Sequence, residues 1–243
     1  MTLVDELRAQ EEAWQRRPLV RRLYHSWYDL VAARLSSAPG PTVELGSGIS
    51  RFKEHYPEVV TSDVQPTPWA ERVVDAEDLP FDEASVVNLV LIDVFHHLAS
   101  PSRFLDAAAR VLAPGGRLIV LDPYCSPVSY CAYRSFHHER TDLAADAFAD
   151  DQHAAEDPMN SNQARATLVF FRHLAEFERR WPGLAVAERR LLALLVYPLS
   201  GGFTKPPLLP AALYGPLFAL ERALLPVLGR LAAFRCLVVL ERR

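Results

Sequence analysis

Apolar residues in the first 38 positions recur every three to four residues, which is the spacing of an amphipathic helix. Pro18 interrupts this run. Proline lacks a backbone N–H and fits best in the first turn of a helix, so we expect two short helices that meet at Pro18. Residues 1–38 are therefore expected to form a helical cap on the rest of the chain.

A second pattern follows, in which short apolar or β-branched runs alternate with helical stretches and glycine- or proline-containing turns. The expected strands are a brief β-branched strand within residues 39–50, followed by 59–61, 73–74, 86–92 and 117–121, and the expected helices are 51–56 and 101–112. The run at 86–92 suits a parallel strand that is buried on both faces. This alternation predicts the α/β class, with a doubly wound, Rossmann-like, mostly parallel sheet.

The rest of the chain departs from this alternation. Residues 125–182 are polar and rich in histidine and acids, with one helix expected over 162–180. Residues 183–243 add a strand at 191–197, a proline-interrupted apolar helix at 208–231 and a last strand at 234–240. We interpret 1–243 as a single domain with a seven-stranded sheet, in which 39–124 form the core, 125–182 an insertion after the fifth strand, and 183–243 the C-terminal strands and apolar helix.

Composition then narrows the function classes. The net charge of −4 gives no basic surface of the kind that nucleic-acid binding needs. The three cysteines lack the paired spacing of a disulfide framework or a structural zinc site, and the N-terminus lacks a signal-peptide pattern, so a cytoplasmic location is expected. The uncharged stretch 206–220 contains four prolines and is shorter than the roughly 20 residues of a membrane span, which leaves peripheral membrane contact open.

Glycines follow the first predicted strand in the segment VELGSGIS, residues 43–50. Gly46 and Gly48 lack a Cβ atom, so a ligand can approach the backbone closely at this turn. Ser50 is a candidate cap for the helix that follows. A dinucleotide fingerprint would have a third glycine at position 51, where this chain has Arg51, and this disfavours a nicotinamide-dependent oxidoreductase.

Four motifs occur in a fixed order: VELGSGIS followed by Asp63, DAEDLPF at 75–81, LVLIDVFHHL at 89–98, and LAPGGRLIVLDPY at 112–124. Together they resemble the class I S-adenosylmethionine-dependent methyltransferases, and among these the small-molecule methyltransferases with a DAEDLPF-like loop after the third strand. The resemblance covers about residues 40–124. It departs from the family at Ser50, where a third glycine is more frequent.

The resemblance implies S-adenosyl-L-methionine as the cofactor. Glu44 would organise the glycine loop near the amino-acid part of the cofactor, Asp63 would accept hydrogen bonds from the ribose, and Asp75 would meet the adenine. Asp93 would lie close to the methionine moiety and the acceptor. The implied cofactor contacts are Glu44, Gly46, Ser47, Gly48, Asp63, Asp75, Ala76 and Asp93.

Two histidines follow Asp93 in the same turn, and either His96 or His97 is a candidate general base because imidazole titrates near neutral pH. Displacement of a methyl group from a sulfonium requires no metal, and the histidines and acids between 137 and 157 match no metal-binding spacing. No metal ligand is therefore assigned, and this segment is interpreted as a polar cap. Candidate acceptor contacts come from the N-terminal helices, the end of the fifth strand and the insertion: Tyr24, Tyr28, Asp122, Tyr124, Tyr130 and His137.

We expect methyl transfer to a small molecule, with oxygen as the favoured acceptor atom. The apolar segment 208–231 motivates the hypothesis of a lipophilic acceptor. The alternative from another class is a binding or regulatory protein that keeps the fold but lacks turnover, and a nicotinamide-dependent oxidoreductase is third. The identity of the acceptor, and whether the protein is a monomer or a homodimer, are left open.

Overall fold

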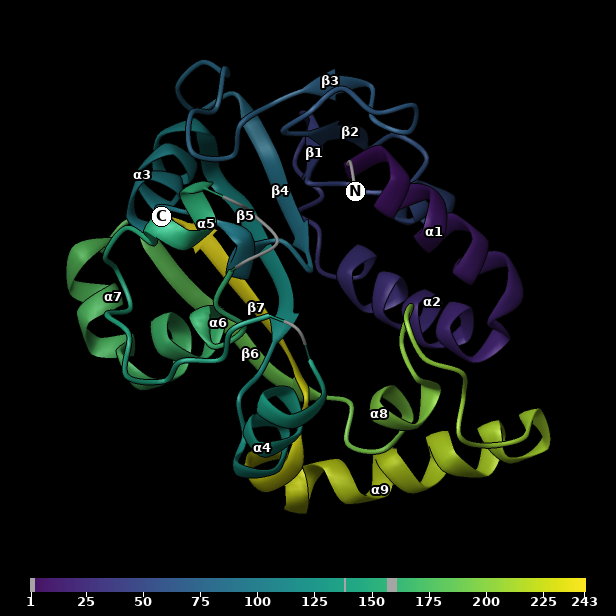
Figure 1. Cartoon of the computed structure of the whole chain (residues 1–243). Helices are drawn as coiled ribbons and strands as arrows, with labels where there is room; N and C mark the ends of the chain where they lie inside the picture. The colour runs from purple at the N-terminus through teal and green to yellow at the C-terminus, as the bar shows by residue number, and fades with distance from the viewer. Residues whose placement is uncertain (1–2, 138, 157–160) are drawn as a thin grey trace.

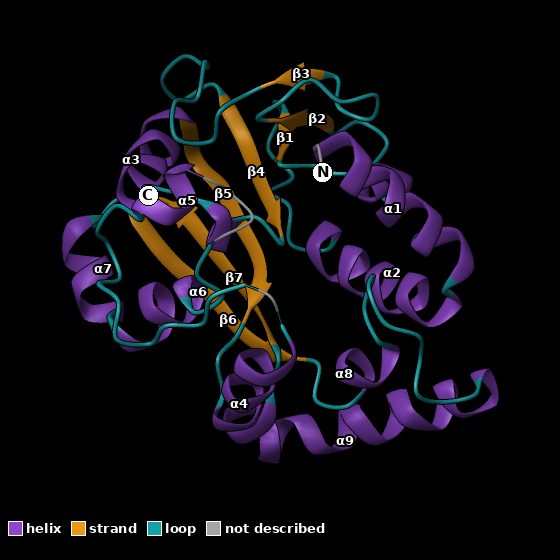
Figure 2. Cartoon of the chain, viewed as in Figure 1, coloured by secondary structure: helices purple, strands orange, loops and turns teal. Residues whose placement is uncertain are grey.

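A seven-stranded sheet forms the centre of the structure, a computed structural model that describes residues 3–137, 139–156 and 161–243 (Figures 1 and 2). The strand order is β3-β2-β1-β4-β5-β7-β6. All neighbours pair in parallel except β7, which is antiparallel to both β5 and β6. The strands are β1 Thr42–Leu45, β2 Val60–Asp63, β3 Arg72–Val73, β4 Val86–Ile92, β5 Leu112–Pro123, β6 Leu184–Leu192 and β7 Arg235–Arg242. The predicted Rossmann-like α/β class is confirmed.

Helices flank this sheet and extend beyond its edge. Figure 1 shows α1 and α2 on one side, α3, α6 and α7 on the other, and α4, α8 and α9 near the end where β5 finishes. The α-helices are α1 Leu3–Arg16, α2 Pro18–Ala32, α3 Pro101–Val111, α4 Pro127–Phe136, α5 Gln152–Glu156, α6 Arg165–Thr167, α7 Leu174–Arg180, α8 Val196–Ser200 and α9 Tyr214–Ala232. Shorter turns are η1 Arg51–Glu54, η2 Phe95–His97, η4 Leu168–Arg172 and η5 Ala211–Leu213.

Local sequence explains several of these boundaries. Pro18 occupies the first turn of α2, as expected from its missing N–H. Ser100 caps α3 by accepting a hydrogen bond from the backbone N–H of Arg103. The first six residues of β4 are fully buried, because sheet neighbours lie on both edges and helices cover both faces.

Some sequence expectations were wrong in detail. The strand expected at 191–197 is β6, which ends at Leu192, and residues 196–200 form α8 instead. The helix expected over 162–180 is divided into α6, a π-helical turn at η4 and α7. Ser50 does not cap the following turn with its side chain; it has a left-handed backbone, with φ of 54°, at the place where the family prefers glycine.

The apolar segment near the C-terminus forms α9, of which few residues are buried. Ala211–Ala232 is long and apolar enough to cross a membrane by length and composition, with a mean hydropathy of 1.3 in its most apolar window. Within α9, however, the buried Glu221 accepts hydrogen bonds from the backbone N–H groups of Leu194, Leu195 and Val196, at 2.9, 2.7 and 2.7 Å. This carboxylate anchors α9 to the start of α8, which favours a surface helix of the fold over a membrane span.

Candidate active site

A cavity of about 1400 Å³ lies at the carboxyl ends of β1, β2 and β4. Helices α1 and α2 contribute to its wall, and so do the end of α4 and the loop after α8. Eleven of the residues predicted from the sequence line it: Tyr24, Tyr28, Glu44, Gly46, Ser47, Gly48, Asp63, Asp93, His96, His97 and His137. This is the edge at which open α/β sheets bind their ligands.

The glycine loop forms one end of the cavity. Gly46 has a φ of +63°, and a Cβ atom there would lie 2.6 Å from Cγ2 of Val94. Gly48 has a φ of +53°, and its backbone N–H donates to Oδ2 of Asp63 at 3.2 Å. A side chain at Gly46 would clash with Val94, and the positive φ at Gly48 favours glycine, so the backbone of this loop between β1 and β2 is open to close approach.

Two carboxyl groups, those of Glu44 and Asp63, line this end of the cavity. Glu44 is buried, and its Oε2 has no hydrogen-bond partner among the described residues. Burial, together with the nearby charge of Asp63, raises the pKa of Glu44 to about 8. Burial also raises the pKa of Asp63, although backbone N–H groups oppose this effect. An ammonium group beside Glu44 and hydroxyl donors at Asp63 would satisfy both groups, so this end fits the amino-acid and ribose parts of S-adenosylmethionine.

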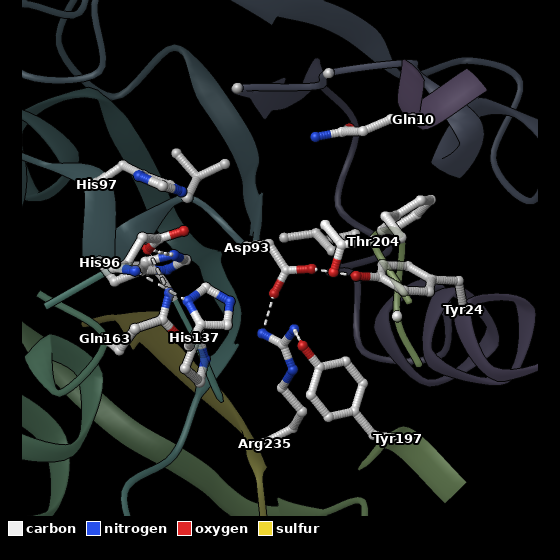
Figure 3. A pocket seen from close by; sticks show the side chains of 18 of the residues that line it. Gln10, Tyr24, Asp93, His96, His97, His137, Gln163, Tyr197, Thr204 and Arg235 are labelled. Carbon is white, nitrogen blue, oxygen red and sulfur yellow. Dashed lines mark hydrogen bonds and ion pairs between the residues drawn. The ribbon is translucent and has the colours of Figure 1, made fainter. Parts of the chain in front are cut away.

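Asp93, at the end of β4, joins a network that the sequence did not reveal. It accepts a hydrogen bond from Oη of Tyr24 at 2.7 Å and forms an ion pair with Arg235 (Figure 3). Arg235 is 5% exposed, donates to Oη of Tyr197 at 2.9 Å, and lies 4.4 Å from the centre of the Tyr197 ring. Its guanidinium also lies 5.6 Å from the ring centre of Trp27. Arg235 thus fixes the Asp93 carboxylate within an aromatic wall.

His96 lies between two carboxylates. Its Nδ1 is 3.0 Å from Oδ1 of Asp122, and its Nε2 is 3.4 Å from Oε2 of Glu139. Burial alone lowers the pKa of His96, but the two carboxylates outweigh this effect and raise the pKa to about 10. Burial likewise raises the pKa of Glu139, but His96 outweighs it and holds the pKa well below its usual range. A histidine held protonated in this way is poorly suited to accept a proton, which leaves the half-buried His97 as the candidate base.

Five predicted contacts lie outside the cavity lining. Tyr124 packs against Phe171, with ring centres 4.9 Å apart, and Tyr130 lies over Arg134 on the outside of α4. Asp122 is fully buried and acts through His96. The expectation of acceptor contacts is corrected for these three, because packing and pairing occupy their side chains. Asp75 is exposed and accepts from the backbone N–H of Glu77, so the adenine contact of Asp75 and Ala76 stays a prediction.

Sequence reasoning missed the residues that come from distant parts of the chain. Arg235 was visible as a lone charge at the start of the apolar run 234–240, and Glu139 as one acid among several histidines. No motif or residue pattern in the sequence singled out Tyr197 or Gln163. Their positions depend on the antiparallel pairing of β7 with β5 and on the path of the insertion, which a residue pattern does not specify.

Known proteins resemble this chain in one segment of the sequence and in the fold. Residues 44–120 match the family described as "Methyltransferase domain". An S-adenosylmethionine-dependent methyltransferase from Thermotoga maritima, a possible histamine N-methyltransferase, is 15% identical; the match covers 99% of each chain with a TM-score of 0.58.

Two other solved structures share the fold. Geranyl diphosphate C-methyltransferase from Streptomyces coelicolor A3(2), in complex with Mg²⁺, geranyl diphosphate and S-adenosyl-L-homocysteine, is 13% identical over 92% of this chain and 82% of that one, with a TM-score of 0.56. The [4+2]-cyclase SpnF is 13% identical over 89% and 80%, with a TM-score of 0.51. Residues 44–120 match a methyltransferase domain, and the chain has the Rossmann-like fold of solved S-adenosylmethionine-dependent methyltransferases, which together support an enzyme of this type.

Proposed function

We propose that this protein transfers a methyl group from S-adenosylmethionine to an oxygen atom of a small molecule. The observation that carries the proposal is a single cavity that joins two different ends. One end has the glycine loop with Glu44 and Asp63, and the other has His97 and the Asp93–Arg235 pair.

The cofactor end supports the proposal through its two carboxyl groups, of which Glu44 has an oxygen without a hydrogen-bond partner among the described residues. Glu44 would hold the amino group of the cofactor, and Asp63 would accept hydrogen bonds from the ribose. Gly46, Ser47 and Gly48 would let the cofactor pass close to the backbone. When bound, S-adenosylmethionine supplies a methyl group on a sulfonium sulfur, which an acceptor displaces directly.

The acceptor end supports transfer to a small molecule. Tyr24 and Tyr28 from α2, with His137 after α4, would contact the acceptor, and Phe203 adds apolar surface. Catalysis of a direct displacement depends on holding the reacting atoms in line at about 3 to 3.5 Å. The buried Asp93–Arg235–Tyr24 network keeps one wall rigid for this purpose, while His97 would accept the proton of the attacking hydroxyl.

The solved structures of similar fold are named for different substrates, geranyl diphosphate in one and, as a possibility, histamine in another. The acceptor of this protein therefore has to be established by experiment. A lipophilic acceptor fits the exposed apolar side chains in the cavity lining and on α9, among them Leu208 and Leu220. We also propose a cytoplasmic location, since the three cysteines lack the spacing of a disulfide framework. The acceptor is not a nucleic acid in this proposal, since the net charge is −4.

Incubation with methyl-labelled S-adenosylmethionine and a fractionated cell extract tests the proposal. The label is expected in the small-molecule fraction with the wild type and to be strongly reduced with Asp63→Ala. Label recovered only in nucleic acid or protein would contradict it. Cofactor binding without transfer to any fraction would favour the non-catalytic binding protein instead.

A further inference from the structure

Three potential metal ligands gather on the wall of the cavity opposite Arg235. One ligand atom each from His96, His97 and Glu139 lies within 4.8 Å of the others. His96 and His97 belong to η2, directly after β4, whereas Glu139 comes from the insertion. Figure 3 shows His96, His97 and His137 on one side of the cavity and the Asp93–Arg235 pair on the other. The cluster therefore forms a surface separate from the Asp93 network.

The spacing of two of these atoms matches a tetrahedral site. Zinc ligands of nitrogen or oxygen lie 2.0–2.2 Å from the ion, which places two tetrahedral ligands roughly 3.3–3.6 Å apart. Nε2 of His96 and Oε2 of Glu139 are 3.4 Å apart. The ligand atoms of the three residues lie within 4.8 Å of one another, which is wider than this spacing. The side chain of the half-buried His97 therefore has to move toward the other two ligands when an ion binds.

Other side chains orient the cluster as they do around metal ions. Asp122 faces Nδ1 of His96, which directs Nε2 of the same ring toward Glu139 and the cavity. Histidine ligands commonly have such a carboxylate on their second nitrogen. Glu139 is itself held by Oγ of Ser161, at 3.1 Å, and by the side-chain amide of Gln163. The candidate ligands are thus oriented by groups that are themselves buried.

Charge balance also favours a cation. Asp122 and Glu139 are both buried, and both pair with the single ring of His96. Charged groups inside a protein are found paired with an opposite charge or coordinated to a metal ion. A divalent ion on neutral histidines would offset both.

We propose that His96, His97 and Glu139 bind a divalent first-row transition-metal ion of the Zn²⁺ type, with an open coordination position toward the cavity. Two imidazoles and one carboxylate are the ligand set of several zinc and iron sites with open positions. His137 lines the same cavity.

The role of the ion rests on the proposed function, whereas its binding does not. An acceptor hydroxyl at the open position would lose its proton more readily, as water does on zinc. His97 would then serve as a ligand, and the hydroxyl proton would pass to solvent.

Titration calorimetry with ZnCl₂, on chelator-treated protein without S-adenosylmethionine, tests the site. One ion per chain is expected, with affinity reduced at least tenfold in His97→Ala and Glu139→Gln. Cobalt(II) should give the visible absorption bands of a tetrahedral site in the wild type and lose them in both variants. Circular dichroism verifies that each variant is folded, and His97→Ala removes only a half-buried side chain.

Two control variants separate this site from surface binding. His173→Ala removes an exposed histidine outside the cavity and should leave the affinity unchanged. His55→Ala disrupts the pair in which Nε2 of His55 lies 2.6 Å from Nδ1 of His25. Zinc binding that is lost in His55→Ala, or unchanged in folded His97→Ala and Glu139→Gln, would overturn the proposal. Zinc binding without methyl transfer would instead contradict only the proposed function.

Discussion

Replacing Glu44 with glutamine removes an ionisable group from the cofactor end of the cavity and preserves its size. Because the pKa of Glu44 is about 8, its carboxyl group is about 90% protonated at pH 7 before a ligand binds. A bound ammonium group stabilises the ionised form. Binding of S-adenosylmethionine is therefore expected to release close to one proton near neutral pH.

The size of the effect follows from the pKa. At pH 6, which is two units below the pKa, ionising Glu44 costs about 2.7 kcal/mol, since each unit is about 1.36 kcal/mol. At pH 7.5 the cost falls to about 0.8 kcal/mol. The affinity of the wild type should consequently rise about 25-fold from pH 6 to pH 7.5. In Glu44→Gln this dependence should disappear.

Titration calorimetry in buffers of different ionisation enthalpy measures both the affinity and the released proton. Glu58→Gln is the matched control, because Glu58 is exposed and does not line the cavity. This control should behave as the wild type does. Wild-type binding without proton release, or an unchanged pH dependence in Glu44→Gln, would refute the assigned contact between Glu44 and the cofactor.

Three further predictions concern the same cavity. Asp63→Ala should weaken S-adenosylmethionine binding by about 10- to 150-fold, through loss of about 1.5–3 kcal/mol of charge-assisted hydrogen bonding; an unchanged dissociation constant would place the ribose elsewhere. The folded-state pKa of Glu44 lies above its unfolded value of 4.5, so its contribution to stability is complete below pH 4.5 and is lost as pH rises to about 8. Between pH 4.5 and 8 the unfolding free energy measured with urea should fall less in Glu44→Gln than in the wild type, by at most about 5 kcal/mol. Parallel plots of unfolding free energy against pH for the two proteins would count against the raised pKa. Arg235→Met should cost about 1–3 kcal/mol of unfolding free energy, because the half-buried Asp93 loses its ion pair and keeps only the hydrogen bond from Tyr24, and Asp93→Asn in the same chain should restore part of it; strictly additive losses would argue against the ion pair.

The sheet was predictable from sequence because its signals are local. The apolar run 86–92 gave the exact bounds of β4, and Pro101 marked the first residue of α3. The glycine loop was equally predictable, since the positive φ values at Gly46 and Gly48 favour residues without a Cβ atom. The resemblance to methyltransferases implied that Glu44 and Asp63 lie near this loop, and both line the cavity at the edge where β1 and β2 end.

The acceptor end was less predictable because long-range pairing builds it. Arg235 reaches Asp93 only because β7 returns antiparallel beside β5, and Glu139 reaches His96 through the insertion. Tyr124 and Tyr130 were misplaced for the same reason, since the direction of a side chain at the end of β5 or on α4 depends on what packs against it. Local periodicity does not encode these partners.

A crystal structure with bound S-adenosylhomocysteine tests the central claim most directly, because it locates the cofactor without requiring the acceptor. The ribose hydroxyls are expected on Asp63 and the amino group on Glu44, with the sulfur directed toward the side of the cavity that holds Asp93 and His97. A ligand bound at another place, or one in this cavity whose ribose and amino group contact neither carboxylate, would contradict the claim.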